Sequence, residues 1–235
     1  MKFLFASDSF KGTLTSRRTA ELLTEAAREI FPSCECVGVE MADGGEGTTE
    51  AVIAAAGGSR IEARVHGPLW DIRTSCYGKL DDRRAVMEMA AASGLTLVPP
   101  EMRDPRKTTT FGTGEMIRDA LDRGFHDISV AIGGSATNDG GIGCMKALGI
   151  RFLDADGKEV DGCGEDLIRI CDIDGSGLDP RVSECRFTVM CDVSNPLCGA
   201  DGATYTFGRQ KGGTPEILDG LEAGMQNYRY IIKKK

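Results

Sequence analysis

A glycine-rich loop between a strand and a helix is the feature that most constrains the fold of this 235-residue chain. Residues 133–141 read GGSATNDGG. The apolar residues 128–132 precede them, and residues 142–148 follow with helical spacing. Glycines let backbone N–H groups approach a ligand closely, and a helix N-terminus attracts anions. The loop therefore predicts either an anion-binding turn containing a carboxylate, or a tight strand-to-helix turn that Asn138 and Asp139 cap.

Charge and hydropathy exclude several classes of protein. The net charge of −8 argues against nucleic-acid binding, which requires a basic face. No apolar run is long enough to span a membrane, and residues 1–8 turn polar too early for a secretory signal. We therefore expect a cytoplasmic protein with neither a nucleic-acid nor a membrane partner.

The cysteine and histidine content limits the chemistry. The nine cysteines include no Cys-x-x-Cys pattern, so we expect reduced thiols rather than disulfides or metal ligands. Cys34 and Cys36 fall in a strand-like segment, and we expect their thiols on opposite faces. With only His66 and His126, a histidine-rich metal site or a Ser-His-Asp triad is not expected.

The N-terminal region has the pattern of a β-α-β-α unit. We predict strands at 2–7 and 36–39, a helix capped by Thr15 or Ser16 that stops before Pro32, and a second helix at 49–56 that ends at Gly57. This order predicts an α/β fold with a parallel sheet.

After residue 59 the pattern of apolar and polar residues changes, and we expect a division into domains 1–60 and 61–235. Alternating apolar residues at 61–65 and a segment at 72–77 predict a strand pair. Further strands are predicted at 85–89, 128–132 and 187–190, and a last helix at 215–232.

Four loops that follow predicted strands combine a carboxylate with glycine, hydroxyl or amide residues. They are residues 8–12, 42–48, 133–141 and 192–195. The carboxyl ends of parallel strands share one edge of a sheet, so these loops are expected to converge on one cleft. Acidic groups there can hold Mg²⁺ or accept a hydroxyl proton, and lysines can balance phosphate charge. These are the components of phosphoryl transfer.

From these loops we select candidate site residues. The catalytic candidates are Asp192, Asp43 and Lys11, with Asp192 or Asp43 preferred to Asp139 as general base or Mg²⁺ ligand. The candidates for binding substrate or phosphate are Asp8, Ser9, Gly44, Gly45, Ser135, Thr137, Asn138, Asp139 and Lys211. The alternatives stay open: Lys11 and Lys211 as solvated lysines, and Asp43 and Asp192 as caps.

Generic nucleotide motifs are absent, but the specific loops resemble a known family. Neither Gly-x-x-x-x-Gly-Lys-Ser/Thr nor an early Gly-x-Gly-x-x-Gly occurs. Residues 8–12, 42–48, 88–95, 133–141, 191–197 and 202–212 resemble the signature blocks of bacterial type-I glycerate kinases. The resemblance implies ATP- and Mg²⁺-dependent phosphorylation of D-glycerate. It also implies a Rossmann-like domain, incomplete here, with a second α/β domain inserted in it.

The resemblance also implies that the chain is truncated at its C-terminus, because members of that family carry further glycine-rich blocks that do not occur here. An apolar face is then expected around Phe3, Phe5, Val37 and Val39. We therefore expect this chain alone to have little or no glycerate kinase activity, and a catalytically incompetent remnant is the alternative to an active kinase. A nicotinamide-dependent enzyme is the weaker alternative, because the dinucleotide motif is missing.

Overall fold

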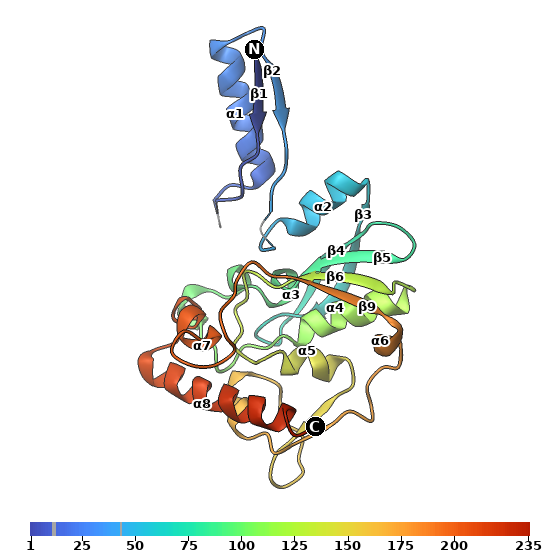
Figure 1. The fold of residues 1–235 in the computed structure, drawn as a ribbon, viewed down its shortest axis with the longest axis vertical. Coiled ribbons are helices and arrows are strands. Elements are labelled where there is room, and N and C mark those ends of the chain that lie inside the picture. The colour runs from blue at the N-terminus through green and yellow to red at the C-terminus, as the bar shows by residue number, and fades with distance from the viewer. Residues whose placement is uncertain (11–12, 43) are drawn as a thin grey trace.

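The computed structural model describes residues 1–10, 13–42 and 44–235. Its N-terminal unit extends away from the rest of the molecule at the top of Figure 1. In this unit β1 (Lys2–Phe5) and β2 (Glu35–Gly38) pair in parallel and are connected by α1 (Ser16–Ile30). Thr15 caps α1 by accepting a hydrogen bond from the N–H of Arg18 at 3.1 Å. The predicted β-α-β unit and its cap are therefore confirmed.

Helix α1 covers one face of this small sheet. A Cβ on Gly38 would lie 3.0 Å from Cβ of Ala20, so the face that carries Gly38 packs directly against α1. Phe3 and Phe5 stack on each other, and both are half-buried. Leu4 alternates with them and is 66% exposed, and Val39 is 41% exposed. Of the expected set, Val39 is therefore exposed and Phe3 and Phe5 are half-buried, and Leu4 is a further exposed apolar side chain of β1.

The expectation that Cys34 and Cys36 face opposite sides is wrong. Their Sγ atoms are 3.4 Å apart. Side chains alternate along a strand with a period of two, so residues i and i+2 share a face.

A five-stranded sheet forms the centre of the molecule, in the order β3-β4-β5-β6-β9. Strands β3 (Ser59–His66) and β4 (Ile72–Lys79) form the predicted antiparallel pair, and β4 pairs antiparallel with β5 (Arg84–Glu88). Strands β5, β6 (Asp127–Ala131) and β9 (Arg186–Met190) run parallel. The loops that follow these three strands therefore leave from the same edge of the sheet.

Helices cover this sheet on both faces. Val86 lies on the face that packs against α2 (Thr48–Ala56), where Gly78 lets Ile53 of the helix approach. Met87 points the other way, into the core shared with α4 (Phe111–Asp122). Because α2 packs on β4 and β5, it lies with the five-stranded sheet rather than with the N-terminal unit. The division at residue 60 stays a prediction.

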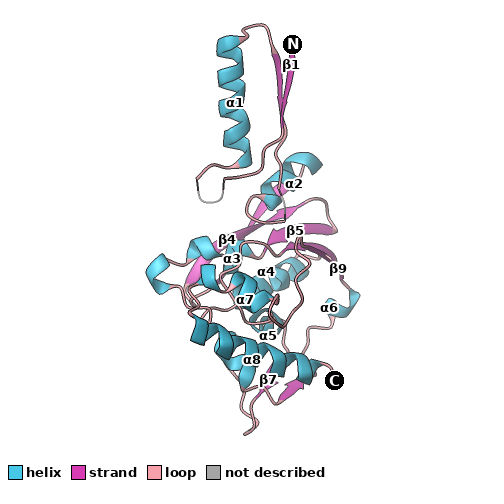
Figure 2. Cartoon of the chain, turned by 60° about the vertical axis from the view of Figure 1, so that its left-hand side comes forward, coloured by secondary structure: helices cyan, strands magenta, loops and turns pink. Residues whose placement is uncertain are grey.

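A third layer lies below α4 and α5 (Ile142–Ala147), at the bottom of Figures 1 and 2. There α8 (Pro215–Ile232), whose predicted bounds are confirmed, packs on a 3₁₀ turn at Gly164–Ile168 and encloses a second core around Phe152 and Met225. The remaining short α-helices and strands are α3 (Ala90–Ser93), β7 (Arg151–Leu153), β8 (Asp172–Asp174), α6 (Arg181–Glu184) and α7 (Ala203–Phe207). The sequence patterns did not predict β7 and β8.

Candidate functional site

Three chain segments that are distant in sequence meet at the carboxyl edge of the central sheet. The N–H of Ile132, after β6, donates to the carbonyl of Met190 at the end of β9 at 3.2 Å. The next residue, Gly133, donates to the carbonyl of Gly44 at 3.0 Å. The loops at 42–48, 133–141 and 190–195 are thereby joined through their backbones. The parallel-strand argument accounts for the two loops after β6 and β9, whereas the loop at 42–48 follows β2 of the separate N-terminal sheet and leads into α2, which packs on the central sheet.

Glycines allow this close approach. A Cβ on Gly133 would lie 2.8 Å from the Cα of Gly45, closer than real Cβ atoms come to other heavy atoms. Gly44 has a φ of +90°, which side-chain-bearing residues rarely adopt. Gly45 is buried, and its carbonyl accepts a hydrogen bond from Thr48 Oγ1 at 2.8 Å. We call the meeting point of Gly44, Gly45 and Gly133 the glycine junction. Gly44 and Gly133 are required there for steric reasons.

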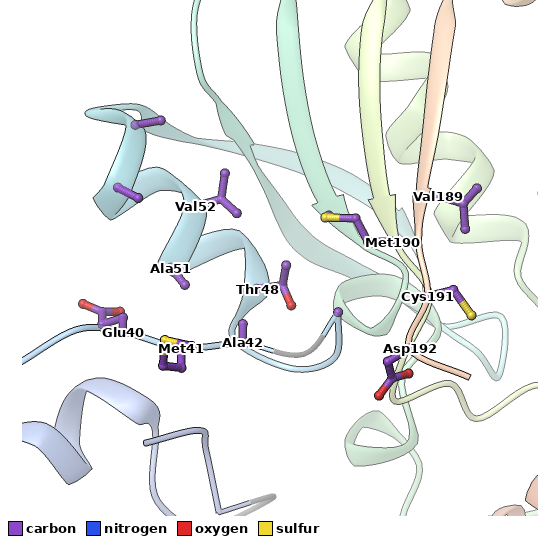
Figure 3. A pocket seen from close by; sticks show the side chains of 13 residues that line it. Glu40, Met41, Ala42, Thr48, Ala51, Val52, Val189, Met190, Cys191 and Asp192 are labelled. Carbon is purple, nitrogen blue, oxygen red and sulfur yellow. The ribbon is translucent and has the colours of Figure 1, made fainter. Parts of the chain in front are cut away.

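An open groove of about 830 Å³ lies beside the junction. Figure 3 shows Ala51 and Val52 of α2 on one side of it, with Met190 and Asp192 at the end of β9 on the other. Gly44 also lines the groove. Asp192 is exposed, so a carboxylate stands at the mouth of a groove whose walls are largely apolar.

Asp139, in contrast, is part of the interior. It is 2% exposed, and its carboxylate accepts hydrogen bonds from the N–H and the hydroxyl of Thr110, at 2.8 and 2.7 Å. It also accepts from the N–H groups of Gly141 and Gly143, at 3.1 and 3.3 Å. Burial raises the pKa of this carboxyl, although these hydrogen bonds oppose the change. Asp139 therefore joins the N-terminal ends of α4 and α5, and it does not line the groove.

The residues before it are also turned inward. Asn138 is buried and donates from Nδ2 to Thr204 Oγ1 at 3.2 Å. Thr108 donates from its hydroxyl to the carbonyl of Ala136 at 3.0 Å. The second half of the glycine-rich loop is thus held by long-range contacts, whereas its first residues lie at the junction.

Lys211 is a buried lysine that binds the same loop. Its ammonium group donates to Ser135 Oγ at 2.8 Å and to the carbonyl of Thr137 at 2.6 Å. It is only 7% exposed, and burial lowers the pKa of Lys211 to about 8, with the charge of Asp139 opposing the change. An ammonium group has donors only, so the Ser135 oxygen accepts and its own hydrogen is left for another acceptor.

Glu88 is a buried acid at this site that the candidate list omitted. It ends β5, is 8% exposed, and accepts a hydrogen bond from the N–H of Thr49 at 2.6 Å. Burial raises the pKa of Glu88, and hydrogen bonds from Thr49 and Gly47 oppose the change. Its carboxylate thus satisfies the first turn of α2, where Gly47 offers no side-chain cap. The available signal was an acid placed between three apolar residues, 85–87, and the apolar Met89.

The remaining candidates lie apart or outside the described residues. Asp8 is exposed on the loop after β1, and its Oδ1 accepts from the N–H of Ser9 at 2.7 Å. Neither residue is among those that line the groove. Lys11 and Asp43 fall outside the described residues, so their place at the groove stays a prediction.

Within the described ranges, no group of three or more histidine, cysteine or acidic side chains is arranged to hold a metal ion. No helix in the described part of the chain is long and apolar enough to cross a membrane.

Comparisons with known proteins agree with the loop signatures. The sequence profile of the Glycerate kinase family matches residues 3–235. The chain is 46% identical over 235 residues to a "Glycerate kinase" of Haemophilus influenzae and 48% identical over 235 residues to a "Glycerate 2-kinase" of Escherichia coli. In both cases the match covers 100% of this chain and 62% of the relative, so the chain spans less than two thirds of their length.

A solved structure shares the fold. The crystal structure of a putative glycerate kinase 2 from Salmonella typhimurium matches with a TM-score of 0.84 at 47% identity. The match covers 100% of this chain and 63% of that one. The α/β architecture is therefore shared along the whole of the present chain.

Proposed function

Because the chain belongs to the glycerate kinase family, we propose that it serves the ATP-dependent phosphorylation of D-glycerate to a phosphoglycerate. The observation that carries this proposal is the junction of the loops at Gly44, Gly133 and Asp192 at one edge of the sheet. It combines a close backbone approach, an exposed carboxylate and an adjoining groove, which are features that phosphoryl transfer requires.

The glycine junction is suited to phosphate. Phosphate groups are held by backbone N–H groups that side chains do not shield. Gly44 and Gly45 adjoin Gly133 at this point, and the hydroxyl of Ser135 follows two residues later. Since Lys211 donates to the Ser135 oxygen, the Ser135 hydrogen can be donated to a phosphate or carboxylate oxygen. We assign the phosphate-binding role to the Ser135 hydroxyl and to the backbone around Gly44 and Gly45, whereas the N–H of Gly133 is donated to the Gly44 carbonyl.

Asp192 is the preferred described candidate for general base or Mg²⁺ ligand. Mg²⁺ in kinases is bound by one or two carboxylates together with substrate phosphates and water. A single exposed carboxylate beside a glycine junction fits that donor set. The ion would neutralise charge that develops on the transferred phosphoryl group. The same carboxylate, if it does not bind the metal, can accept the proton of the reacting hydroxyl.

The buried groups have supporting roles in this proposal. Asp139 and Asn138 are occupied by interior contacts, so they shape the loop rather than contact substrate. Thr137 accepts a hydrogen bond from Lys211 with its carbonyl. Lys211 contributes positive charge behind Ser135. Lys11, Asp43, Asp8 and Ser9 stay proposed contacts for phosphate or glycerate, and a cytoplasmic location stays part of the proposal.

An assay that couples ADP release to D-glycerate tests the proposal. Any turnover by the chain is expected to require both D-glycerate and Mg²⁺, and Asp192→Asn is expected to reduce kcat by about 100-fold or more, as for a lost catalytic acid–base group. Asp156→Asn is the matched control, because Asp156 is exposed on a distant turn. Retained turnover in Asp192→Asn would refute the role of Asp192. Ligand binding without turnover in the wild-type chain would support a non-catalytic chain instead.

A further inference from the structure

Two cysteines of the N-terminal unit form a close pair. Cys34 Sγ and Cys36 Sγ are 3.4 Å apart, and both side chains are partly exposed. Cys34 follows the turn after α1, where its N–H donates to the carbonyl of Phe31 at 2.9 Å, and Cys36 is paired with Phe3 in the β1–β2 ladder. We propose that Cys34 and Cys36 are a thiol–disulfide exchange site that closes to an intramolecular disulfide on reaction with a low-molecular-weight disulfide.

The backbone geometry permits the bond. Residues two apart in an extended strand have Cα atoms about 6.6 Å apart, within the usual range for disulfides. Their Cβ atoms leave the same face of the strand, as the observed thiol contact requires. An S–S bond is about 2.05 Å long, so the two sulfur atoms must approach each other by a little over 1 Å. Side-chain rotation alone can supply such a movement.

The exchange takes two steps, one for each thiol. Burial raises the pKa of Cys36, and the neighbouring Cys34 adds to this effect, whereas Arg28 on α1 opposes it. One of the two thiolates attacks the small disulfide, forming a mixed disulfide and releasing one thiolate. The other thiolate then attacks the protein sulfur of this mixed disulfide and releases the second thiolate. The protein loses two hydrogens and two electrons, and the small disulfide becomes two thiols.

The other thiols lack such an arrangement. Cys144 and Cys163 are buried, and burial raises the pKa of each to about 12. Cys171 and Cys191 are exposed, but their Sγ atoms contact backbone carbonyls. In the described residues, Cys34 and Cys36 are the pair whose thiols contact each other. The exchange is therefore expected to be selective for this pair.

Treatment of the whole native chain with glutathione disulfide tests the proposal. Remaining thiols are then alkylated, and the products are identified by intact mass and peptide mapping. We expect the wild-type chain to show a bridge between Cys34 and Cys36, with two fewer alkylated thiols and no glutathione on either residue. Cys34→Ser and Cys36→Ser are expected to retain glutathione on the remaining thiol, because no partner can release it. Cys171→Ser, the control, is expected to form the same bridge as the wild type.

Several results would overturn the proposal. They are a wild-type chain that keeps glutathione at Cys34 or Cys36, one whose two thiols stay fully alkylated, and one whose bridge involves another cysteine. The wild-type result stands without the variants, so misfolding of a serine variant cannot hide the outcome. None of these readouts depends on kinase turnover.

Discussion

The ammonium group of Lys211 lies 2.8 Å from the hydroxyl oxygen of Ser135, although the two residues are 76 positions apart. This contact ties the segment before α8 to the start of the glycine-rich loop. It buries a positive charge to which, in the described structure, no carboxylate is hydrogen-bonded. The stability of this part of the fold is therefore expected to depend on the protonation of one lysine.

Replacing Lys211 with Met is expected to change how stability depends on pH. The folded-state pKa of Lys211, about 8, lies below its ordinary value of 10.5. Between these values the unfolded chain binds more protons than the folded chain, so the contribution of Lys211 to stability rises as pH rises from about 8 to 10.5. In total the change amounts to roughly 3 kcal/mol. In urea unfolding at pH 7 to 10, the unfolding free energy of the wild type should rise relative to that of Lys211→Met across this window.

The control for that experiment is Lys158→Met, because Lys158 is exposed. Its unfolding free energy should differ from the wild type by a nearly constant amount across the same pH range. If the unfolding free energies of Lys211→Met and the wild type changed in parallel with pH, the lowered pKa of Lys211 would be contradicted.

Glu88→Ala is expected to loosen the first turn of α2. The substitution removes the acceptor for the N–H of Thr49 and leaves that buried donor unpaired, which costs about 1–3 kcal/mol. Glu88→Gln keeps an acceptor oxygen and should cost less. Hydrogen exchange at the Thr49 amide measures the effect directly, and equal protection in the Ala variant and the wild type would show that Glu88 does not hold the turn.

Asp139→Asn is expected to destabilise the chain by about 2–4 kcal/mol. The carboxylate accepts hydrogen bonds from Thr110, Gly141 and Gly143, and an amide would turn its own N–H groups toward some of these donors. Asp161→Asn is the matched control, since Asp161 is exposed and should change stability by no more than about 0.5 kcal/mol. Thermal unfolding of the two variants gives the comparison, and equal midpoints would contradict the structural role of Asp139.

Two glycines of α8 are expected to respond to alanine in opposite directions. Gly220 is exposed with no heavy atom within 4 Å of an added Cβ, so Gly220→Ala should stabilise the chain by about 0.5–1 kcal/mol through helix propensity. At Gly224 an added Cβ would lie 3.0 Å from Leu167 Cβ and 3.1 Å from the nitrogen of Ile168. Gly224→Ala should therefore cost about 1–3 kcal/mol. Denaturant unfolding measures the unfolding free energy of both variants. A change in the same direction for both would be inconsistent with this packing.

Local sequence patterns predicted most of the secondary structure, because their causes are local. The α1 cap at Thr15 is a hydrogen bond between residues three apart, and the end of α2 at Gly57 needs only a left-handed glycine with a φ of 72°. The apolar spacing of α8 and the Pro215 at its start were sufficient to place the whole helix. The short strands β7 and β8 were missed, because three residues each carry too little periodicity.

The family, the α/β class and the position of the polar loops follow from the residues alone, since they depend on residue types and short spacings. Which of the polar residues face solvent follows instead from the packing of the folded chain. Asp192 and Asp139 both follow a strand in a polar loop, yet one is exposed beside the groove and the other is buried. The partners that bury Asp139 and Lys211 come from positions 29 and 76 residues away, and no local pattern encodes such contacts. Burial is set by the neighbours that folding brings together, so it followed from the packing of the whole chain.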